Sequence, residues 1–229
     1  YRAKADGKGL YRFFAAEMDA ALQARRMLEL DLRDALQRGE LSVHFQPLVD
    51  IASATLIGCE ALARWTHPLR GTVSPAEFIP VAEETGLILA LGDFVLRAAC
   101  REAAGWADDM VVAVNLSTVQ FRAAGLVDQV RRALAEAGLP ARRLELEITE
   151  SILIDDKASA MRVLAELRAL GVRIALDDFG TGYSSLAYLS SFPFDKIKID
   201  RSFVRDVENR PDAAAIIRAI SSIAATLGM

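Results

Sequence analysis

Six polar side chains stand at or just past the ends of apolar, strand-like runs of this 229-residue chain. They are Glu60, Asn115, Glu147, Asp177, Asp178 and Lys198. Carboxylate and amide oxygens are the ligands that Mg²⁺ and Mn²⁺ prefer, whereas zinc sites favour thiolates and imidazoles. Two such ions on the order of 3.5–4 Å apart are the usual device for in-line displacement at phosphorus. The residue types therefore indicate that chemistry, with Lys198 positioning water or neutralising charge.

Each of these residues also has an ordinary structural interpretation. The pair Asp177-Asp178 precedes Gly180, as it would in a turn, and Lys198 alone is typical of a solvated lysine at a strand end. The stretch FGTGYSS at 179–185 is either a plain β-to-α connection or a loop that closes over a phosphate. The series as a whole favours function, because apolar strands have no structural need for carboxylates at the same end every time.

The elements that would position these groups alternate along the chain. Strand-like runs occupy residues 110–117, 144–150, 173–179 and 195–201. Helix-like segments lie at 124–137 and after Asp155, which predicts a parallel sheet. In a parallel β/α barrel the carboxyl ends of the strands form one rim, where residues distant in sequence meet. The earlier pair 42–51 and 55–62 is joined too closely for a crossover helix and is expected to be antiparallel.

Composition narrows the class of protein. A chain with 52% hydrophobic residues and this length can bury one sizeable core. Its net charge of −4 argues against a nonspecific nucleic-acid binder or a polybasic membrane patch. Cys59 and Cys100 lie in apolar surroundings without C-x-x-C spacing, so buried thiols in a reducing, cytoplasmic compartment are expected. From the residues given we expect neither a signal peptide nor a membrane-length apolar run, although a membrane anchor upstream stays open.

Motifs spread in order over about residues 40–229 resemble those of the EAL family of cyclic di-GMP phosphodiesterases. They are QPLVD at 46–50, CEALARW at 59–65, FIPVAEETGLI at 78–88, NLS at 115–117, EITES at 147–151, DDFGTGYSSL at 177–186 and KIDRSFV at 198–204. The opening residues resemble the closing segment of a GGDEF diguanylate cyclase domain. The resemblance implies a GGDEF-like tail at 1–14, a connecting helix at 15–38 and an EAL phosphodiesterase domain at 39–229. From the sequence alone the 15–38 helix is equally a connector, a dimerising helix or a core helix.

The resemblance implies an α/β fold, a modified TIM (β/α)8 barrel whose first strand runs antiparallel. The implied ligands of two divalent ions, Mg²⁺ or Mn²⁺, are Glu60, Asn115, Glu147, Asp177 and Asp178. The implied catalytic residues are Glu60 and Lys198, of which Lys198 holds the water nucleophile. The implied substrate contacts are Gln46, Leu62 and Arg64. Glu150 matches a glutamate that anchors the loop 179–186.

The activity that the resemblance implies is metal-dependent hydrolysis of cyclic di-GMP to linear pGpG in bacterial second-messenger signalling. The expected partners are cyclic di-GMP, a second copy in a homodimer and an adjoining GGDEF-like domain upstream, but no nucleic-acid polymer. A catalytically silent cyclic di-GMP receptor that signals through the 15–38 helix is the alternative. Receptors of this family commonly lose EAL or DDFGTG residues, which are intact here. A purely dimerising scaffold is a third interpretation.

The family also carries a further metal-binding glutamate, in an A-E-G-V-E type motif, beyond the segment that ends here at Leu227-Gly228-Met229. We therefore expect a barrel that lacks its last two strand–helix units and one metal ligand. A longer polypeptide is favoured over an incomplete barrel, because the open edges of a parallel sheet are a stability and aggregation problem.

Overall fold

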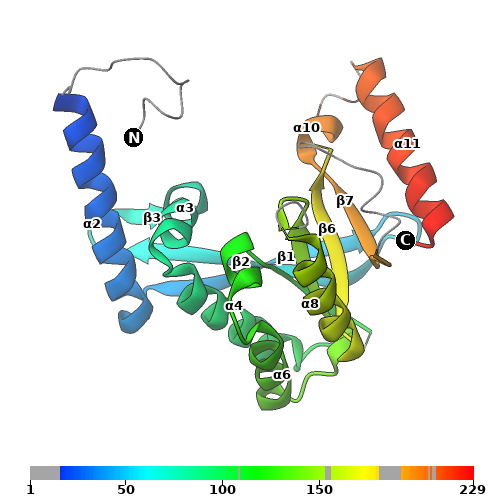
Figure 1. Ribbon diagram of the computed structural model, residues 1–229, viewed down its shortest axis with the longest axis horizontal. Coiled ribbons are helices and arrows are strands. Elements are labelled where there is room, and N and C mark those ends of the chain that lie inside the picture. Colours follow the sequence, from blue (N-terminus) through cyan, green and yellow to red (C-terminus); the bar gives the residue numbers. More distant parts are fainter. Residues whose placement is uncertain (1–15, 108, 153–155, 181–191, 206, 208–209) are drawn as a thin grey trace.

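A computed structural model of the chain describes residues 16–107, 109–152, 156–180, 192–205, 207 and 210–229 (Figure 1). The segment 1–14, which the sequence assigns to a GGDEF-like tail, lies outside the described residues. The described strands form one mixed sheet in the order β1-β2-β4-β5-β6-β7, with β3 paired to β2. Their bounds are β1 Leu41–Asp50, β2 Thr55–His67, β3 Gly71–Val73, β4 Val111–Asn115, β5 Leu144–Thr149, β6 Arg173–Phe179 and β7 Lys196–Ile199.

The predicted strands are all present, and the prediction of an antiparallel first pair is confirmed. From β2 onward the neighbours β4, β5, β6 and β7 pair in parallel, as the regular alternation predicts. The predicted end of the second strand, at residue 62, was wrong: β2 continues to His67. It does so because a tight hairpin through Gly71, at φ 69°, pairs its last residues with β3.

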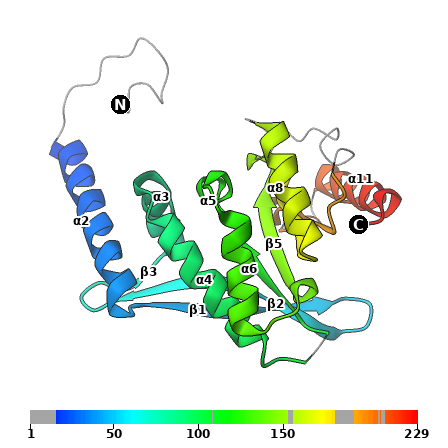
Figure 2. The ribbon, with the colours of Figure 1, turned by 60° about the horizontal axis from the view of Figure 1, so that its bottom comes forward.

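Helix α2 precedes the first strand and the other helices follow strands; α4, α6 and α8 lie along one face of the sheet (Figure 2). Their bounds are α2 Ala16–Arg38, α3 Pro75–Thr85, α4 Ile88–Ala103, α5 Thr118–Arg122, α6 Leu126–Ala137, α8 Lys157–Ala169, α10 Arg201–Val204 and α11 Pro211–Leu227, with a 3₁₀ turn at Ala141–Arg143. Gly171 follows α8 at φ 92°, as expected of a residue that ends a helix. Among the described helices, none is both long and apolar enough to cross a membrane.

The two faces of the parallel strands differ sharply in composition. Val112 and Val114 of β4 belong to the apolar core beneath the helices, whereas the alternate residues Ala113 and Asn115 do not. Along β5, Leu144, Leu146 and Ile148 lie in that core, while Glu145 and Glu147 alternate with them. Because side chains alternate across a strand, the small and charged residues share the opposite face, here called the inner face.

This arrangement, with helices outside and polar residues inside, is that of a (β/α)8 barrel, and the expected fold class is confirmed. Among the described strands β1 and β7 end the strand order, so the sheet does not close on itself. Cys59 and Cys100 are both free and buried, as predicted.

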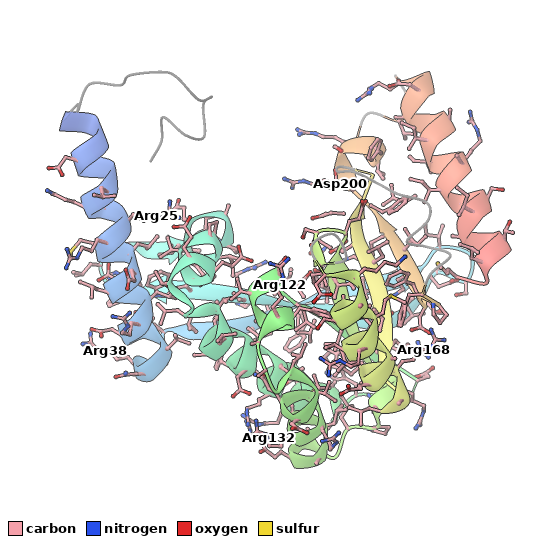
Figure 3. All side chains as sticks on the ribbon, in the orientation of Figure 1. Arg25, Arg38, Arg122, Arg132, Arg168 and Asp200 are labelled. Carbon is pink, nitrogen blue, oxygen red and sulfur yellow. The ribbon has the colours of Figure 1, made fainter. Side chains whose placement is uncertain are left out.

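Helix α2 is packed onto the domain through its second half. Leu28, Leu32 and Ala35 are buried in the main core, and Arg25 pairs with Glu84 of α3 at 2.5 Å (Figure 3). Leu22, nearer the start of the helix, is 68% exposed. The helix is therefore a core helix in its second half, while its first half extends away from the sheet.

We predict that Gly58→Ala destabilises the fold, because Gly58 of β2 is paired with Val111 of β4 and has no room for a side chain. A Cβ on Gly58 would lie 2.1 Å from the backbone carbonyl oxygen of Val111, and a strand backbone cannot move aside as a side chain can. We expect urea denaturation to show a loss of about 1–3 kcal/mol in the free energy of unfolding. Gly105→Ala is the matched control, because the nearest atom to its Cβ would be 3.5 Å away. Equal stability of the two variants would contradict this prediction.

Candidate active site

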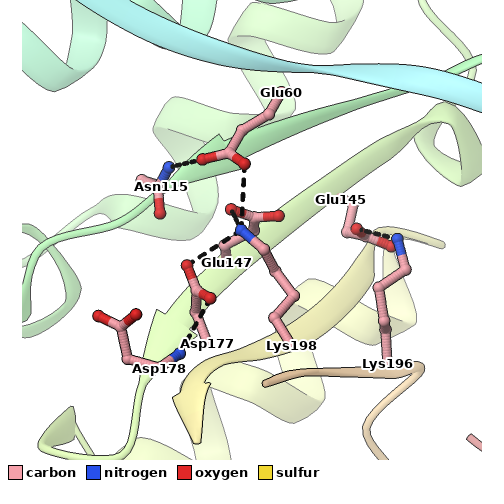
Figure 4. Close-up of polar contacts among 8 residues, drawn as sticks. All are labelled: Glu60, Asn115, Glu145, Glu147, Asp177, Asp178, Lys196 and Lys198. Carbon is pink, nitrogen blue, oxygen red and sulfur yellow. Dashed lines mark hydrogen bonds and ion pairs between the residues drawn. The ribbon is translucent and has the colours of Figure 1, made fainter. Parts of the chain in front are cut away.

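Five of the predicted site residues meet on the inner face, each from a different strand (Figure 4). They are Glu60 on β2, Asn115 on β4, Glu147 on β5, Asp177 on β6 and Lys198 on β7. The prediction that strand-end polar groups gather at one rim is therefore confirmed as geometry. Their chemical roles remain proposals.

Lys198 is the centre of this cluster. Its Nζ donates hydrogen bonds to Glu147 Oε2 at 2.5 Å, to Asp177 Oδ2 at 3.1 Å and to Glu60 Oε2 at 3.2 Å. Asn115 Nδ2 donates to the other oxygen of Glu60, Oε1, at 2.8 Å. One ammonium thus bridges three carboxylates, and the amide fixes the orientation of Glu60.

The pairing of the strands explains this convergence. Asn115 is the direct neighbour of Glu147 in the β4–β5 ladder, and Glu60 is the neighbour of Ala113, one inner-face position before Asn115. The β6–β7 register shifts between Leu176 and Phe179. Such irregularities re-aim side chains next to active sites, and this one contains both aspartates.

Burial and charge act against each other in this cluster. Burial of Glu147, whose side chain is 1% exposed, raises the pKa of its carboxyl to about 7 against the opposing pull of Lys198. The nearby charges of Glu60 and Asp177 raise the pKa of Glu147 further. Burial would lower the pKa of Lys198, but the three carboxylates outweigh it and hold that pKa above its ordinary value. Lys198 is therefore a permanent cation.

Asp178 lies beside the cluster but takes no part in the bonds to Lys198 (Figure 4). Its backbone N–H donates to Asp177 Oδ1 at 2.9 Å, and its φ of 52° is in the left-handed region. Burial, and then the charges of Asp177 and Asp200, raise the pKa of Asp178. Asp200 stands at the start of α10, where its Oδ1 accepts a hydrogen bond from the backbone N–H of Ser202 (Figure 3). The two carboxylates form a second acidic position next to the first.

The predicted substrate contacts surround Glu60. Gln46 of β1 lies directly opposite Glu60 in the antiparallel ladder and is exposed. Leu62 and Arg64 follow Glu60 on β2 at intervals of two and so share its face. A cavity of about 390 Å³ reaches Leu62, Arg64 and Asn115, and its apolar wall comes from helices α3 and α4. A mainly apolar cavity therefore borders Asn115 of the cluster and the predicted substrate contacts Leu62 and Arg64.

Glu150 contacts the start of the loop that follows the aspartate pair. It is buried, and its Oε1 accepts a hydrogen bond from the backbone N–H of Gly180 at 3.1 Å. The loop-anchoring role expected of Glu150 stays a prediction. Residues 181–186 of that loop lie outside the described residues.

The donor set suits a hard divalent cation. Every candidate ligand offers oxygen, and the second oxygen of Glu147, Oε1, is buried and has no hydrogen-bond partner among the described residues. In the described part of the chain no three acidic, histidine or cysteine side chains converge closely enough to bind an ion as they stand. Lys198 occupies the space between the carboxylates instead.

One ion pair next to the site was not predicted from the sequence. Lys196 Nζ bonds Glu145 Oε1 at 2.6 Å, two residues before Lys198 and Glu147 on the same strands (Figure 4). The alternation of side chains along a strand was the available signal. It places Glu145 on the same face as Glu147.

Comparison with known proteins identifies the family. The model of the EAL domain family matches residues 29–229. The uncharacterized protein y4lL of Sinorhizobium fredii is 53% identical over 228 residues, which cover 100% of this chain and 28% of that protein. The bifunctional diguanylate cyclase/cyclic di-GMP phosphodiesterase MucR of Pseudomonas aeruginosa is 46% identical over 233 residues, which cover 100% of this chain and 34% of MucR. The chain thus spans about a third or less of the length of these relatives.

The same family is found among solved structures. A structure described as "PaMucR Phosphodiesterase, c-di-GMP complex" has a TM-score of 0.85 and 46% identity, and the match covers 89% of this chain and 84% of that one. The match to the family model extends over all the strands that bear the Lys198 cluster. The chain belongs to the EAL domain family.

Proposed function

We propose that this chain hydrolyses cyclic di-GMP to linear pGpG with the help of divalent metal ions. The observation that carries the proposal is the cluster of three carboxylates around Lys198, next to a mainly apolar cavity. Family membership supports the substrate, because MucR is named as a cyclic di-GMP phosphodiesterase and its solved structure as a c-di-GMP complex.

Two metal positions are proposed from the residues present. Glu60, Asn115, Glu147 and Asp177 would hold one Mg²⁺ or Mn²⁺, and Asp178 would serve the second. Bound ions supply Lewis-acid stabilisation of the phosphate charge and a more acidic water. The buried, unbonded Oε1 of Glu147 supports this assignment, since a buried carboxylate oxygen is costly to leave without a partner.

The proposed role of Lys198 is to hold the attacking water. Its Nζ is a donor within hydrogen-bond distance of all three carboxylates, so water bound there would face groups able to accept its proton. The water oxygen forms the new bond to phosphorus, and the bond from phosphorus to the 3′ oxygen of the neighbouring ribose breaks. This opens the ring to pGpG with one terminal phosphate.

Substrate contacts are proposed on the strands next to Glu60. Arg64 offers a cation for a phosphate and Gln46 offers an amide for a base or phosphate, while Leu62 supplies apolar contact. Glu150, through Gly180, would couple the loop 179–186 to the site. An upstream GGDEF-like domain, a homodimer and a cytoplasmic location in bacterial signalling complete the proposal for the whole protein.

A catalytically silent cyclic di-GMP receptor is the second candidate. It is favoured by one observation, namely that the Lys198 ammonium already contacts three of the proposed metal-binding carboxylates. The two candidates differ in a single result, which is whether bound cyclic di-GMP is turned over.

We predict that the chain converts cyclic di-GMP to pGpG with Mg²⁺ or Mn²⁺, and that EDTA stops the reaction. Glu60→Ala and Asp177→Asn should each lower kcat by about 10²-fold or more, because each removes a carboxylate of the cluster. Chromatographic separation of the two nucleotides measures both effects. Glu136→Gln is the control, since Glu136 is 56% exposed on α6 and pairs only at the surface, with Arg97.

Tight binding of cyclic di-GMP without any pGpG would overturn the hydrolase and support the receptor. Unchanged turnover in both cluster variants would show that the chemistry occurs elsewhere.

A further prediction concerns pH. Because the pKa of Glu147 is raised to about 7, this carboxyl holds a proton in slightly acidic solution and must lose it before it can bind a cation. We expect Mn²⁺ affinity, measured by titration calorimetry, to rise by about tenfold from about pH 6 to about pH 8. Glu147→Gln should bind Mn²⁺ more weakly and flatten this dependence, while Asp212→Asn on α11 should not. An equal slope in wild type and Glu147→Gln would exclude Glu147 as the titrating group.

A further inference from the structure

The turn that joins β4 to α5 is closed by a capping box. Ser117 Oγ accepts a hydrogen bond from the backbone N–H of Gln120 at 3.2 Å, and Gln120 Oε1 accepts one from the backbone N–H of Ser117 at 3.3 Å. Each side chain thus satisfies a backbone donor near the start of the helix, where donors have no partner in a preceding turn. Asn115, whose amide fixes the orientation of Glu60, lies at the end of β4, two residues before Ser117 (Figure 4).

Gln120 differs from an ordinary capping residue because it is buried, with only 5% of the residue exposed. Its amide lies directly against the backbone of α4 at Gly92. A Cβ on Gly92 would lie 1.7 Å from Gln120 Nε2, 2.4 Å from its Cδ and 2.9 Å from its Oε1. The side chain of Gln120 therefore occupies the space that any larger residue at position 92 would need, and it brings the turn into contact with α4.

The helix itself gives no reason for a glycine at this position. Gly92 lies in the second turn of α4 and is not among the described glycines with positive φ. An alanine would adopt the same helical conformation and would favour the helix, because glycine is a poor helix former. The contact with the Gln120 amide is thus the structural reason for a glycine here.

The position of Asn115 depends on the backbone of this turn. Asn115 is exposed, and among the described contacts its side chain makes one hydrogen bond, to Glu60 Oε1 at 2.8 Å. On one side of the turn, the backbone N–H of Leu116 donates to the backbone carbonyl oxygen of Glu147 at 2.9 Å. On the other side, the next backbone N–H donates to Gln120 Oε1. Loss of the Gln120 bond would therefore free the turn on its α5 side, while the β5 side stays fixed.

We propose that Gln120 is a positioning residue, which rests on Gly92 and fixes the turn that presents Asn115 to Glu60. Asn115 is a proposed ligand of the first metal ion, so Gln120 would act on metal binding through Asn115. That part of the inference rests on the proposed function, whereas the effect of Gln120 on the contact between Asn115 and Glu60 does not.

The variant Gly92→Ala tests the inference without removing any hydrogen-bonding group. The three atoms nearest to the added methyl group all belong to the amide of Gln120, which is the end of a flexible side chain, so we expect Gln120 to move away. In the metal-free protein, the NMR signal of the Asn115 side-chain amide should then shift from its wild-type position, as it should in Gln120→Ala. Gly105→Ala is the matched control and should leave that signal unchanged, because the nearest atom to its Cβ would be 3.5 Å away.

The same variants are expected to weaken metal binding. Mn²⁺ affinity, measured by titration calorimetry, should fall about 10- to 100-fold in Gly92→Ala and in Gln120→Ala, the effect typical of losing a residue that orients a metal ligand. Gly105→Ala should retain the wild-type affinity. A merely structural capping box would lower the melting temperature of Gln120→Ala but leave the Asn115 signal and the Mn²⁺ affinity unchanged.

The double variant Gly92→Ala with Gln120→Ala separates positioning from a general loss of packing. Because the added methyl group acts on the turn through Gln120, the two changes should not add, and the Asn115 signal and Mn²⁺ affinity should equal those of Gln120→Ala alone. Its melting temperature should exceed that of Gln120→Ala, because alanine favours the helix and there fills space that Gln120 has left.

Two results would overturn the inference. The first is a wild-type Asn115 signal and wild-type Mn²⁺ affinity in Gln120→Ala or, if that variant fails to fold, in Gly92→Ala. The second is a double variant in which the two losses add, since Gly92 would then act apart from Gln120. A wild type without turnover would contradict the proposed hydrolysis alone, because the contact of Asn115 is measured in the metal-free protein.

Discussion

The structure depends on placing several negative charges close together at positions where water stabilises them only in part, since the side chain of Glu147 is 1% exposed and those of Glu60 and Asp177 are 16% and 17% exposed. Glu60, Glu147 and Asp177 come within hydrogen-bond distance of one ammonium, that of Lys198. Removing Lys198 would leave these carboxylates without a compensating cation, a loss that for a buried pair in proteins typically amounts to about 3–5 kcal/mol. The site is therefore poised between two kinds of cation, the lysine within the chain and the metal ions that the carboxylates are suited to bind.

The rest of the fold makes that concentration of charge possible. Valine, leucine and isoleucine on one face of the parallel strands β4 to β7 pack in the apolar core beneath the helices, so the outer layer supplies much of the stability of the domain. The inner face is then available for polar residues, with Ala113 and Ala175 between them as small neighbours. Glu145 and Lys196 add a neutral pair beneath the net negative cluster. Each of the two rows along β5 and β7 thus contains a glutamate–lysine pair.

Much of this was predictable from the sequence, and the reason is the period of the strand. The alternation of apolar and polar residues, together with the short connection between the first two strands, was sufficient to predict the six main strands and the antiparallel first pair. The position of polar residues at strand ends was sufficient to predict that Glu60, Asn115, Glu147, Asp177 and Lys198 meet. Cross-strand register was not predictable, since it depends on features such as the irregularity beside Leu176. The pairing of Glu145 with Lys196 and the separation of Asp178 from the Lys198 network both follow from register, so they required the structure.

The central claim is that the Lys198 cluster breaks a phosphodiester bond. Phosphorus NMR of the chain mixed with cyclic di-GMP and Mg²⁺ tests it most directly, because a phosphodiester and a terminal phosphate monoester give distinct signals. The account predicts that the monoester signal of pGpG grows with time and that Lys198→Met abolishes this growth. A phosphodiester signal that shifts on binding and then stays constant would contradict it.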